Sequence, residues 1–169
     1  MRLAPEIDTI PTIPTSSLSR VNMDPRYPVP YLGEGIHLSG FTSETIDAAL
    51  GVMLESPLMH FEVRHLGGAV AERSPEHGSL DCVPWPFTMM AFGLALDKEM
   101  VHVMDEQIAV LLHRLSPWDS GFRYLNFAER ELDVRKIFPP ESYERLRAIK
   151  ATVDPTELFR ANHRIPPAA

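Results

Sequence analysis

Tyr124 and Asn126 are the two side chains whose types and spacing best suit chemistry on a flat ligand. Residues 121–127 around them are rich in β-formers, and side chains along a strand alternate between two faces. A strand here places Phe122, Tyr124 and Asn126 on one face. A phenol and a carboxamide that lie side by side can donate and accept hydrogen bonds at the edge of a planar molecule. The alternative is structural, with both side chains bonded to neighbouring backbone groups.

Further features follow this pair in a fixed order: Tyr143-Glu144-Arg145-Leu146, Asp154-Pro155, Leu158-Phe159 and a final Asn162-His163-Arg164-Ile165-Pro166. This ordered set resembles the carboxy-terminal end of the berberine bridge enzyme-like flavoproteins, oxidases that bind FAD in a separate amino-terminal domain. Upstream, Asn22-Met23-Asp24-Pro25, Gly33-Glu34-Gly35 and residues 62–68 are similar to the substrate domain of bacterial members. The resemblance covers nearly the whole chain.

The resemblance implies roles for individual residues. Tyr124 corresponds to a tyrosine that abstracts or orients a substrate proton, and Asn126 to a residue that contacts the edge of the isoalloxazine ring. Because the pKa of a free tyrosine is about 10, Tyr124 needs a nearby cation or the charge of the flavin to act as a base at neutral pH. The implied cofactor is FAD, and the implied ligand is a small-molecule substrate.

The sequence lacks a Gly-rich phosphate-binding loop and anything similar to the family's amino-terminal FAD domain. We therefore expect this chain alone not to retain FAD. A split enzyme, a remnant and a domain cut from a longer protein all fit this pattern. The FAD-binding domain is expected to come from elsewhere, either as a partner chain or as another part of the same protein.

Composition excludes several classes of protein. The chain has 169 residues, a net charge of −7 and 44% hydrophobic residues, which is typical of a globular protein and not of a nucleic-acid binder. A single cysteine, Cys82, argues against a disulfide framework and favours a cytoplasmic location. No apolar run is long enough to span a membrane. Cys-x-x-Cys and His-Glu-x-x-His are both absent, so no metal site is expected.

Residues 1–31 contain six prolines, which favour an extended path, and enough apolar side chains to pack on something. We interpret them as an extended arm, followed at residues 32–169 by a substrate-domain-like sheet whose end, about residues 120–169, is the segment similar to the flavoproteins. Strands are expected at 36–39, after a turn at Gly33-Glu34-Gly35, and at 58–66, 87–96 and 121–127. Helices are expected from residue 43, at 98–115 and at 141–151. This order predicts an α+β fold, an antiparallel sheet with helices packed on one face.

Two of the expected helices have apolar stripes at helical spacing. The stripe of the first consists of Ile46, Ala49, Leu50, Met53 and Leu54. The stripe of the second consists of Met100, Met104, Ile108, Leu111 and Leu115.

The strands supply further pocket candidates. Alternation in 58–66 puts Glu62 and Arg64 on the face opposite Phe61 and Val63, toward a pocket or another domain. The alternative is a solvated ion pair. In 87–96, Thr88 and Met90 stand where plant members of the similar family commonly carry polar active-site residues, and this departure argues against a plant-type alcohol oxidation.

Two functions remain open. The first is the carboxy-terminal substrate-binding domain of an FAD-dependent oxidoreductase, incomplete as an enzyme without an FAD-binding domain or partner chain. The second is a non-catalytic binding module that associates with itself as a homodimer through an exposed apolar sheet face. The first predicts flavin binding once that other domain is present, and the second predicts a colourless, stable dimer.

Overall fold

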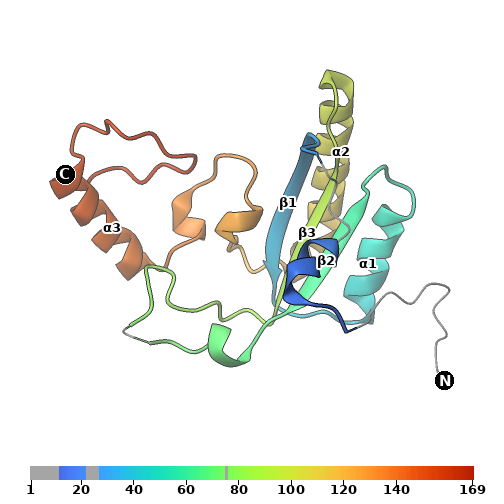
Figure 1. Ribbon diagram of the computed structural model, residues 1–169, viewed down its shortest axis with the longest axis horizontal. Helices are drawn as coiled ribbons and strands as arrows, with labels where there is room; N and C mark the ends of the chain where they lie inside the picture. Colours follow the sequence, from blue (N-terminus) through green and yellow to red (C-terminus); the bar gives the residue numbers. More distant parts are fainter. Residues whose placement is uncertain (1–11, 22–26, 75) are drawn as a thin grey trace.

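The centre of the molecule is a three-stranded antiparallel sheet. The computed structural model describes residues 12–21, 27–74 and 76–169. The strands are β1 (Tyr31–Leu38), β2 (His60–His65) and β3 (Phe87–Leu94), in the spatial order β1-β3-β2. The helices α1 (Ser43–Met53) and α2 (Lys98–Leu115) cover one face of the sheet (Figure 1). The predicted α+β class, with helices on one face, is confirmed.

The hydrophobic core lies between the sheet and the two helices. Alternate residues of the strands point into it, among them Ile36 and Leu38 of β1 and Met89 and Ala91 of β3. From α2 the buried residues are Met104, Ile108, Leu111 and Leu115. These four belong to the stripe predicted from the sequence, so the expected packing of this helix is confirmed.

The first helix follows the expected stripe only in part, because Ala49 is buried and Met53 packs against the core while the other three members are exposed. Its start is as predicted, since the Thr42 side chain accepts from the Thr45 backbone and the two residues form a capping box. Its buried residues are Thr45, Ala49 and Val52, whereas the expected Ile46, Leu50 and Leu54 are exposed. The helix is therefore rotated so that Thr45, Ala49 and Val52 face the core.

Strand β1 starts five residues earlier than expected, and Gly33 and Gly35 lie inside it rather than in a turn. Both glycines allow a close approach. A Cβ atom at Gly33 would lie 2.7 Å from Cβ of Phe92, and one at Gly35 would lie 2.6 Å from Cβ of Phe127. The expectation of a turn was wrong because glycine is also required where another residue packs directly on a strand.

We expect Gly35→Ala to destabilise the chain by about 2 kcal/mol, because the new methyl group would also lie 2.9 Å from the Met89 carbonyl oxygen and the backbone cannot move aside. Denaturant unfolding measures the loss. Gly51→Ala in α1 is the matched control, since a Cβ atom there meets nothing within 4 Å. This control should stabilise the helix by roughly 0.5 to 1 kcal/mol. Equal effects at both positions would contradict the close contact at Gly35.

The chain beyond α2 forms a less tightly packed part. It contains the 3-10 helices η3 (Ser116–Trp118), η4 (Leu125–Phe127) and η5 (Val134–Lys136), and the α-helix α3 (Pro140–Val153). Figure 1 shows α3 standing away from the sheet, and none of its side chains is buried. The helix expected at 141–151 is confirmed. Because α3 buries no side chain in this chain, we expect another surface to cover it.

The amino-terminal region is described only in part. A 3-10 helix, η1 (Thr15–Arg20), interrupts the extended path expected there. The Pro30 carbonyl accepts a hydrogen bond from Ala95, which attaches the end of the region to the sheet. The rest of the expected arm, residues 1–11 and 22–26, lies outside the described residues. Among the helices that the structure describes, none is both long and apolar enough to cross a membrane.

Candidate functional site

The face of the sheet away from α1 and α2, here called the open face, carries the polar strand residues. The strand residues on this face are Gly33, Gly35 and His37 of β1, Thr88, Met90 and Phe92 of β3, and His60, Glu62 and Arg64 of β2. The strand register aligns His37, Thr88 and Arg64 in one row and Gly35, Met90 and Glu62 in the next. The sheet thus brings the four strand residues selected from the sequence, Glu62, Arg64, Thr88 and Met90, onto one surface.

Residues 121–127 do not form the expected strand. The chain runs beside β1 only briefly, through a bridge between Leu38 and Asp119 and a hydrogen bond from the Ser120 amide to the His37 carbonyl. Gly121 then turns the chain with a φ of 80°, and Arg123 donates to both carboxylate oxygens of Asp119, each at 2.9 Å. These local bonds close a turn and stop strand pairing.

The turn separates the two residues with predicted roles. Tyr124 caps η4 and is half-buried, whereas Asn126 lies within η4 and is exposed. In a 3-10 helix residues i and i+3 share a side, so Tyr124 contacts Phe127 and not Asn126. The rings of Tyr124 and Phe127 meet edge to face, with centroids 5.2 Å apart. The shared strand face of Tyr124 and Asn126 was therefore a wrong prediction, while their roles stay predictions.

Phe127 attaches η4 to the open face. Its ring lies over Gly35, and the Arg64 guanidinium stacks on it with its carbon 5.1 Å from the ring centroid. The Tyr124 ring lies 6.1 Å from the His37 ring. The result is a cluster in which Tyr124 and Arg64 pack on one phenylalanine and a buried histidine lies beside the tyrosine. This arrangement puts the cation Arg64 close to Tyr124.

The charges of the cluster are arranged around Glu62. Its carboxylate accepts from Arg64 and lies 3.2 Å from Nε2 of His60. The hydrogen bond from Arg64 holds the pKa of Glu62 below its usual range, so the carboxylate is ionised at neutral pH. The pKa of Arg64 is raised, chiefly by Glu62 and in smaller part by the charge of Tyr124. An electrostatic link therefore runs from Glu62 through Arg64 to Tyr124.

The other two candidates from the sequence have different environments. Thr88 is buried, and its hydroxyl donates to the Ile36 carbonyl at 3.4 Å, which is a bond within the sheet. Met90 is also buried. Neither carries a polar group free to meet a ligand among the described contacts, and the pocket role of both stays a prediction.

Two residues of the cluster were missed by sequence reasoning, His37 and Phe127. His37 alternates with the core residues Ile36 and Leu38, a pattern that places it on the open face. Phe127 was expected on the opposite side of a strand from Tyr124. The signal that could have found it is Gly35, because a glycine inside a strand marks a position where another residue packs closely.

The Asp154-Pro155 and Leu158-Phe159 motifs near the carboxy terminus have a structural explanation. The buried Asp154 carboxylate pairs with Lys150 and accepts from the backbone amides of Leu158, at 2.7 Å, and Phe159, at 3.3 Å. These bonds hold the pKa of Asp154 below its usual range, with the Lys150 bond the largest cause. They end α3 and fix the turn through Leu158-Phe159. Within the described residues, no group of three or more His, Cys, Asp or Glu could hold a metal ion.

The comparisons with known proteins agree with this arrangement. Residues 123–166 match the family model described as "Berberine and berberine like". No curated protein sequence matches the chain. Among solved structures, wild-type BBE-like 1 of Physcomitrella patens superposes with a TM-score of 0.74 at 17% identity, over 88% of this chain and 33% of that protein.

Two more solved structures have the same fold. Phl p 4, a grass pollen allergen with glucose dehydrogenase activity, gives a TM-score of 0.66 at 16% identity, over 82% of this chain and 33% of that one. A variant of berberine bridge enzyme superposes with a TM-score of 0.65 at 17% identity, over 82% of this chain and 33% of that enzyme. This chain therefore spans about a third of the length of the structures it matches.

The family match and the fold support the same conclusion, which confirms the resemblance found in the sequence. The matched segment contains Tyr124, Phe127 and the Asp154 turn. The fold matches extend from it over the sheet and its helices. Residues 123–166 thus match the berberine and berberine-like family, and the chain as a whole has the fold of the carboxy-terminal third of berberine bridge enzyme-like structures.

Proposed function

We propose that this chain is the substrate-binding domain of an FAD-dependent oxidoreductase and that an FAD-binding domain, in the same protein or in a partner chain, completes its catalytic site. The observation that carries the proposal is the contact between the family segment and the sheet. Phe127 packs on Gly35 and under Arg64, and so holds Tyr124 at the open face. The residue with the predicted proton role therefore lies half-buried at this face, beside a cation.

The residues present fit one side of a flavin ring. None of the hydrogen bonds made by described side chains involves the Tyr124 hydroxyl or the Asn126 amide, so both can meet a ring and a substrate. FAD, when bound, supplies the acceptor for the hydride of the substrate. Tyr124 then orients the substrate or holds its proton, Arg64 supplies a positive charge beside it, and Glu62 holds Arg64 in place.

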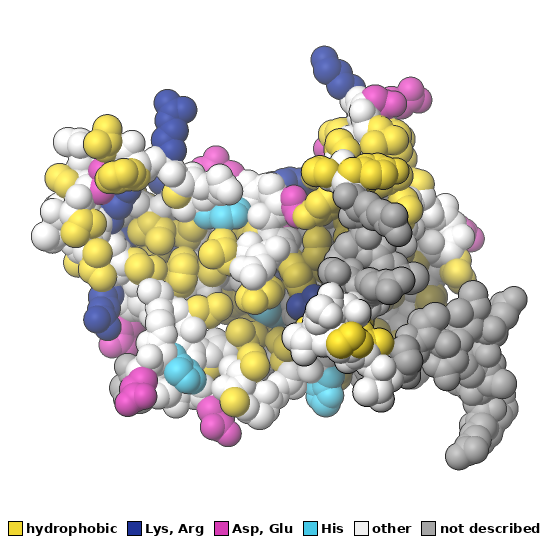
Figure 2. Space-filling view, viewed as in Figure 1, with side chains coloured by type: hydrophobic (Ala, Val, Ile, Leu, Met, Phe, Trp, Pro, Cys, Tyr) yellow, Lys and Arg dark blue, Asp and Glu magenta, His cyan; other side chains and the backbone are white. Residues whose placement is uncertain are grey.

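Exposed apolar side chains in the carboxy-terminal part support the proposal that another domain packs against this chain. Ile149, Val153, Leu158 and Phe159 are all exposed, with exposed fractions of 78% at Leu158 and 73% at Phe159. Figure 2 shows apolar side chains at the surface of this end of the molecule. Helix α3 has no buried face in this chain. A helix with uncovered apolar residues is typical of a surface that packs against a partner domain.

We expect the chain to be colourless when it is purified without added cofactor, because the sequence has no diphosphate-binding loop. Absorbance in the flavin bands, measured against protein concentration, checks this result. A stoichiometric flavin signal would show that this chain holds far more of the FAD site than the open face.

Titration with riboflavin tests the proposal directly, because riboflavin carries the ring system without the diphosphate. Amide resonances of η4 and β2 should shift in NMR spectra of the labelled chain. Arg64→Gln should weaken binding severalfold, since the guanidinium lies beside Tyr124. Arg114→Gln, on the exposed side of α2, is the matched control and should change nothing. Shifts confined to other parts of the chain would count against the proposal.

The exposed apolar residues also support the second candidate, a non-catalytic module that pairs with itself. In that case α3 and the Leu158-Phe159 turn would pack against the same surface of a second copy. Sedimentation at several concentrations should then show a dimer, and Phe159→Asp should dissociate it. A monomer at all concentrations, with riboflavin shifts on the open face, favours the first candidate.

A further inference from the structure

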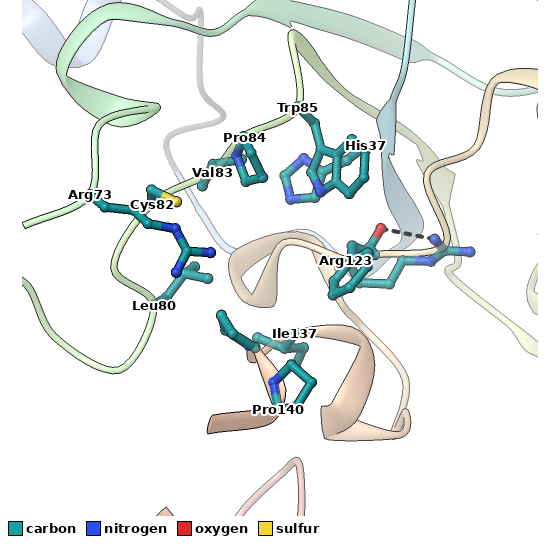
Figure 3. A pocket seen from close by; sticks show the side chains of 12 residues that line it. His37, Arg73, Leu80, Cys82, Val83, Pro84, Trp85, Arg123, Ile137 and Pro140 are labelled. Atoms are coloured by element: carbon teal, nitrogen blue, oxygen red, sulfur yellow. Dashed lines mark hydrogen bonds between the residues drawn. The ribbon is translucent and has the colours of Figure 1, made fainter. Parts of the chain in front are cut away.

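A cavity of about 180 Å³ lies beyond the end of β1, next to the open-face cluster. Its walls come from the loop before β3, from residues 122–123 and from the chain between η5 and α3. Figure 3 shows the His37 ring projecting from β1 toward the loop that carries Val83, Pro84 and Trp85, with Ile137 and Pro140 on another side. Tyr124, Asn126, Glu62 and Arg64 do not line it. The cavity therefore adjoins the open-face cluster at His37, which belongs to both, and its other walls come from residues outside that cluster.

Most of the cavity wall is apolar, and its buried polar group is His37. This residue is only 3% exposed, and its Nδ1 atom is buried without a hydrogen-bond partner among the described residues. A buried polar atom without a partner costs free energy, so a ligand that bonds to it gains an advantage. Burial, and then the charge of Arg123, lower the pKa of His37 to about 4, which keeps the ring neutral at neutral pH.

The charged groups at the cavity are already paired. Arg123 donates to both oxygens of Asp119 and also to the Phe122 carbonyl. Arg73 lies at the rim, 3.3 Å from Asp81. None of the described residues that line the cavity carries a carboxylate. The remaining chemistry is an apolar space with one neutral imidazole nitrogen.

We propose that this cavity binds a small aromatic molecule with one hydroxyl group, a monocyclic phenol, whose hydroxyl pairs with Nδ1 of His37. A cavity of about 150 Å³ accommodates benzene, so this one holds a ring with one or two small substituents. A hydroxyl both donates and accepts, and it therefore matches His37 in either tautomer. The site rests on the cavity and on His37, and it does not depend on the flavin assignment.

Titration calorimetry with phenol and toluene tests the site. Both are expected to bind the full chain saturably, with the ring in the apolar space. In His37→Leu the preference for phenol over toluene should fall about tenfold, the usual effect of one hydrogen bond to a buried group. His37→Gln keeps a polar partner and should retain most of the preference. An unchanged preference in His37→Leu would overturn the role of His37.

A variant that fills the cavity tests the same proposal if His37→Leu fails to fold. Val83→Trp fills the cavity from the loop and should abolish binding of both probes. The matched control is Val110→Trp on the exposed surface of α2, which should bind both as the unmodified chain does. Equal binding by the two tryptophan variants, or no saturable binding by the unmodified chain, would mean that the cavity holds only water.

Discussion

Lowering the pH from 7 to 4 is expected to remove about 3 kcal/mol from the free energy of unfolding through His37 alone. The pKa of this histidine falls from an ordinary 6.5 to about 4 in the folded chain, mainly because burial disfavours its charged form. Between these two values the unfolded chain binds the proton and the folded chain does not. The stability that His37 contributes is therefore complete above pH 6.5 and is lost as the pH falls toward 4.

Denaturant unfolding of the chain and of His37→Leu, at a series of pH values, measures this contribution. Asp119 and Arg123 are the charged neighbours of His37, and they act in opposite directions on its pKa. Protonation of carboxylates with lowered pKa values, such as Glu62 and Asp133, also reduces the stability of the folded chain in acid. Because His37→Leu keeps all of these groups, the difference between the two proteins isolates His37. Parallel pH profiles would contradict its neutral, buried state.

Tyr124→Phe is expected to lower turnover about a hundredfold in the enzyme completed with its FAD-binding domain, the usual scale for losing a positioned acid or base. Stability should change by less than about 1 kcal/mol, because the ring stays in contact with Phe127 and only the hydroxyl is lost. Steady-state kinetics and thermal melts of the same preparations measure both quantities.

Tyr143→Phe is the matched control for this result. Tyr143 lies on α3, where its ring faces the Arg147 guanidinium at 5.8 Å and not the open face. Its loss of a hydroxyl should leave turnover unchanged. If Tyr124→Phe instead costs several kcal/mol of stability, with activity lost only in proportion, the phenol supports the fold and has no role in proton transfer.

The Gly35–Phe127–Arg64 stack connects the two parts of this protein. The glycine leaves space on the sheet, the phenylalanine comes from the family segment, and the arginine covers it from β2. A change in any of the three should therefore move Tyr124 as well. Effects on Tyr124 chemistry and on packing can be separated only with variants such as Tyr124→Phe, which leave the stack in place.

The sequence by itself determined the features that depend on local pattern. The stripe from Met104 to Leu115 predicted the packing of α2, because helical spacing puts those side chains on one face whatever surrounds them. Alternation in β2 placed Glu62 and Arg64 together for the same reason. The order of motifs near the carboxy terminus identified the family, and the Asp154 turn explains that part of the order physically.

Tertiary structure alone decided the features that depend on which surfaces meet. The β-forming residues 121–127 became a turn and a 3-10 helix, because β1 offers them only a brief pairing and Gly121 turns the chain. From the sequence alone Gly35 predicts a turn, and only the structure shows that Phe127 packs on it. His37 looks like any strand residue until its burial is known. For Gly35 and His37 the local pattern is ambiguous, and contacts with residues distant in the sequence decide their environment.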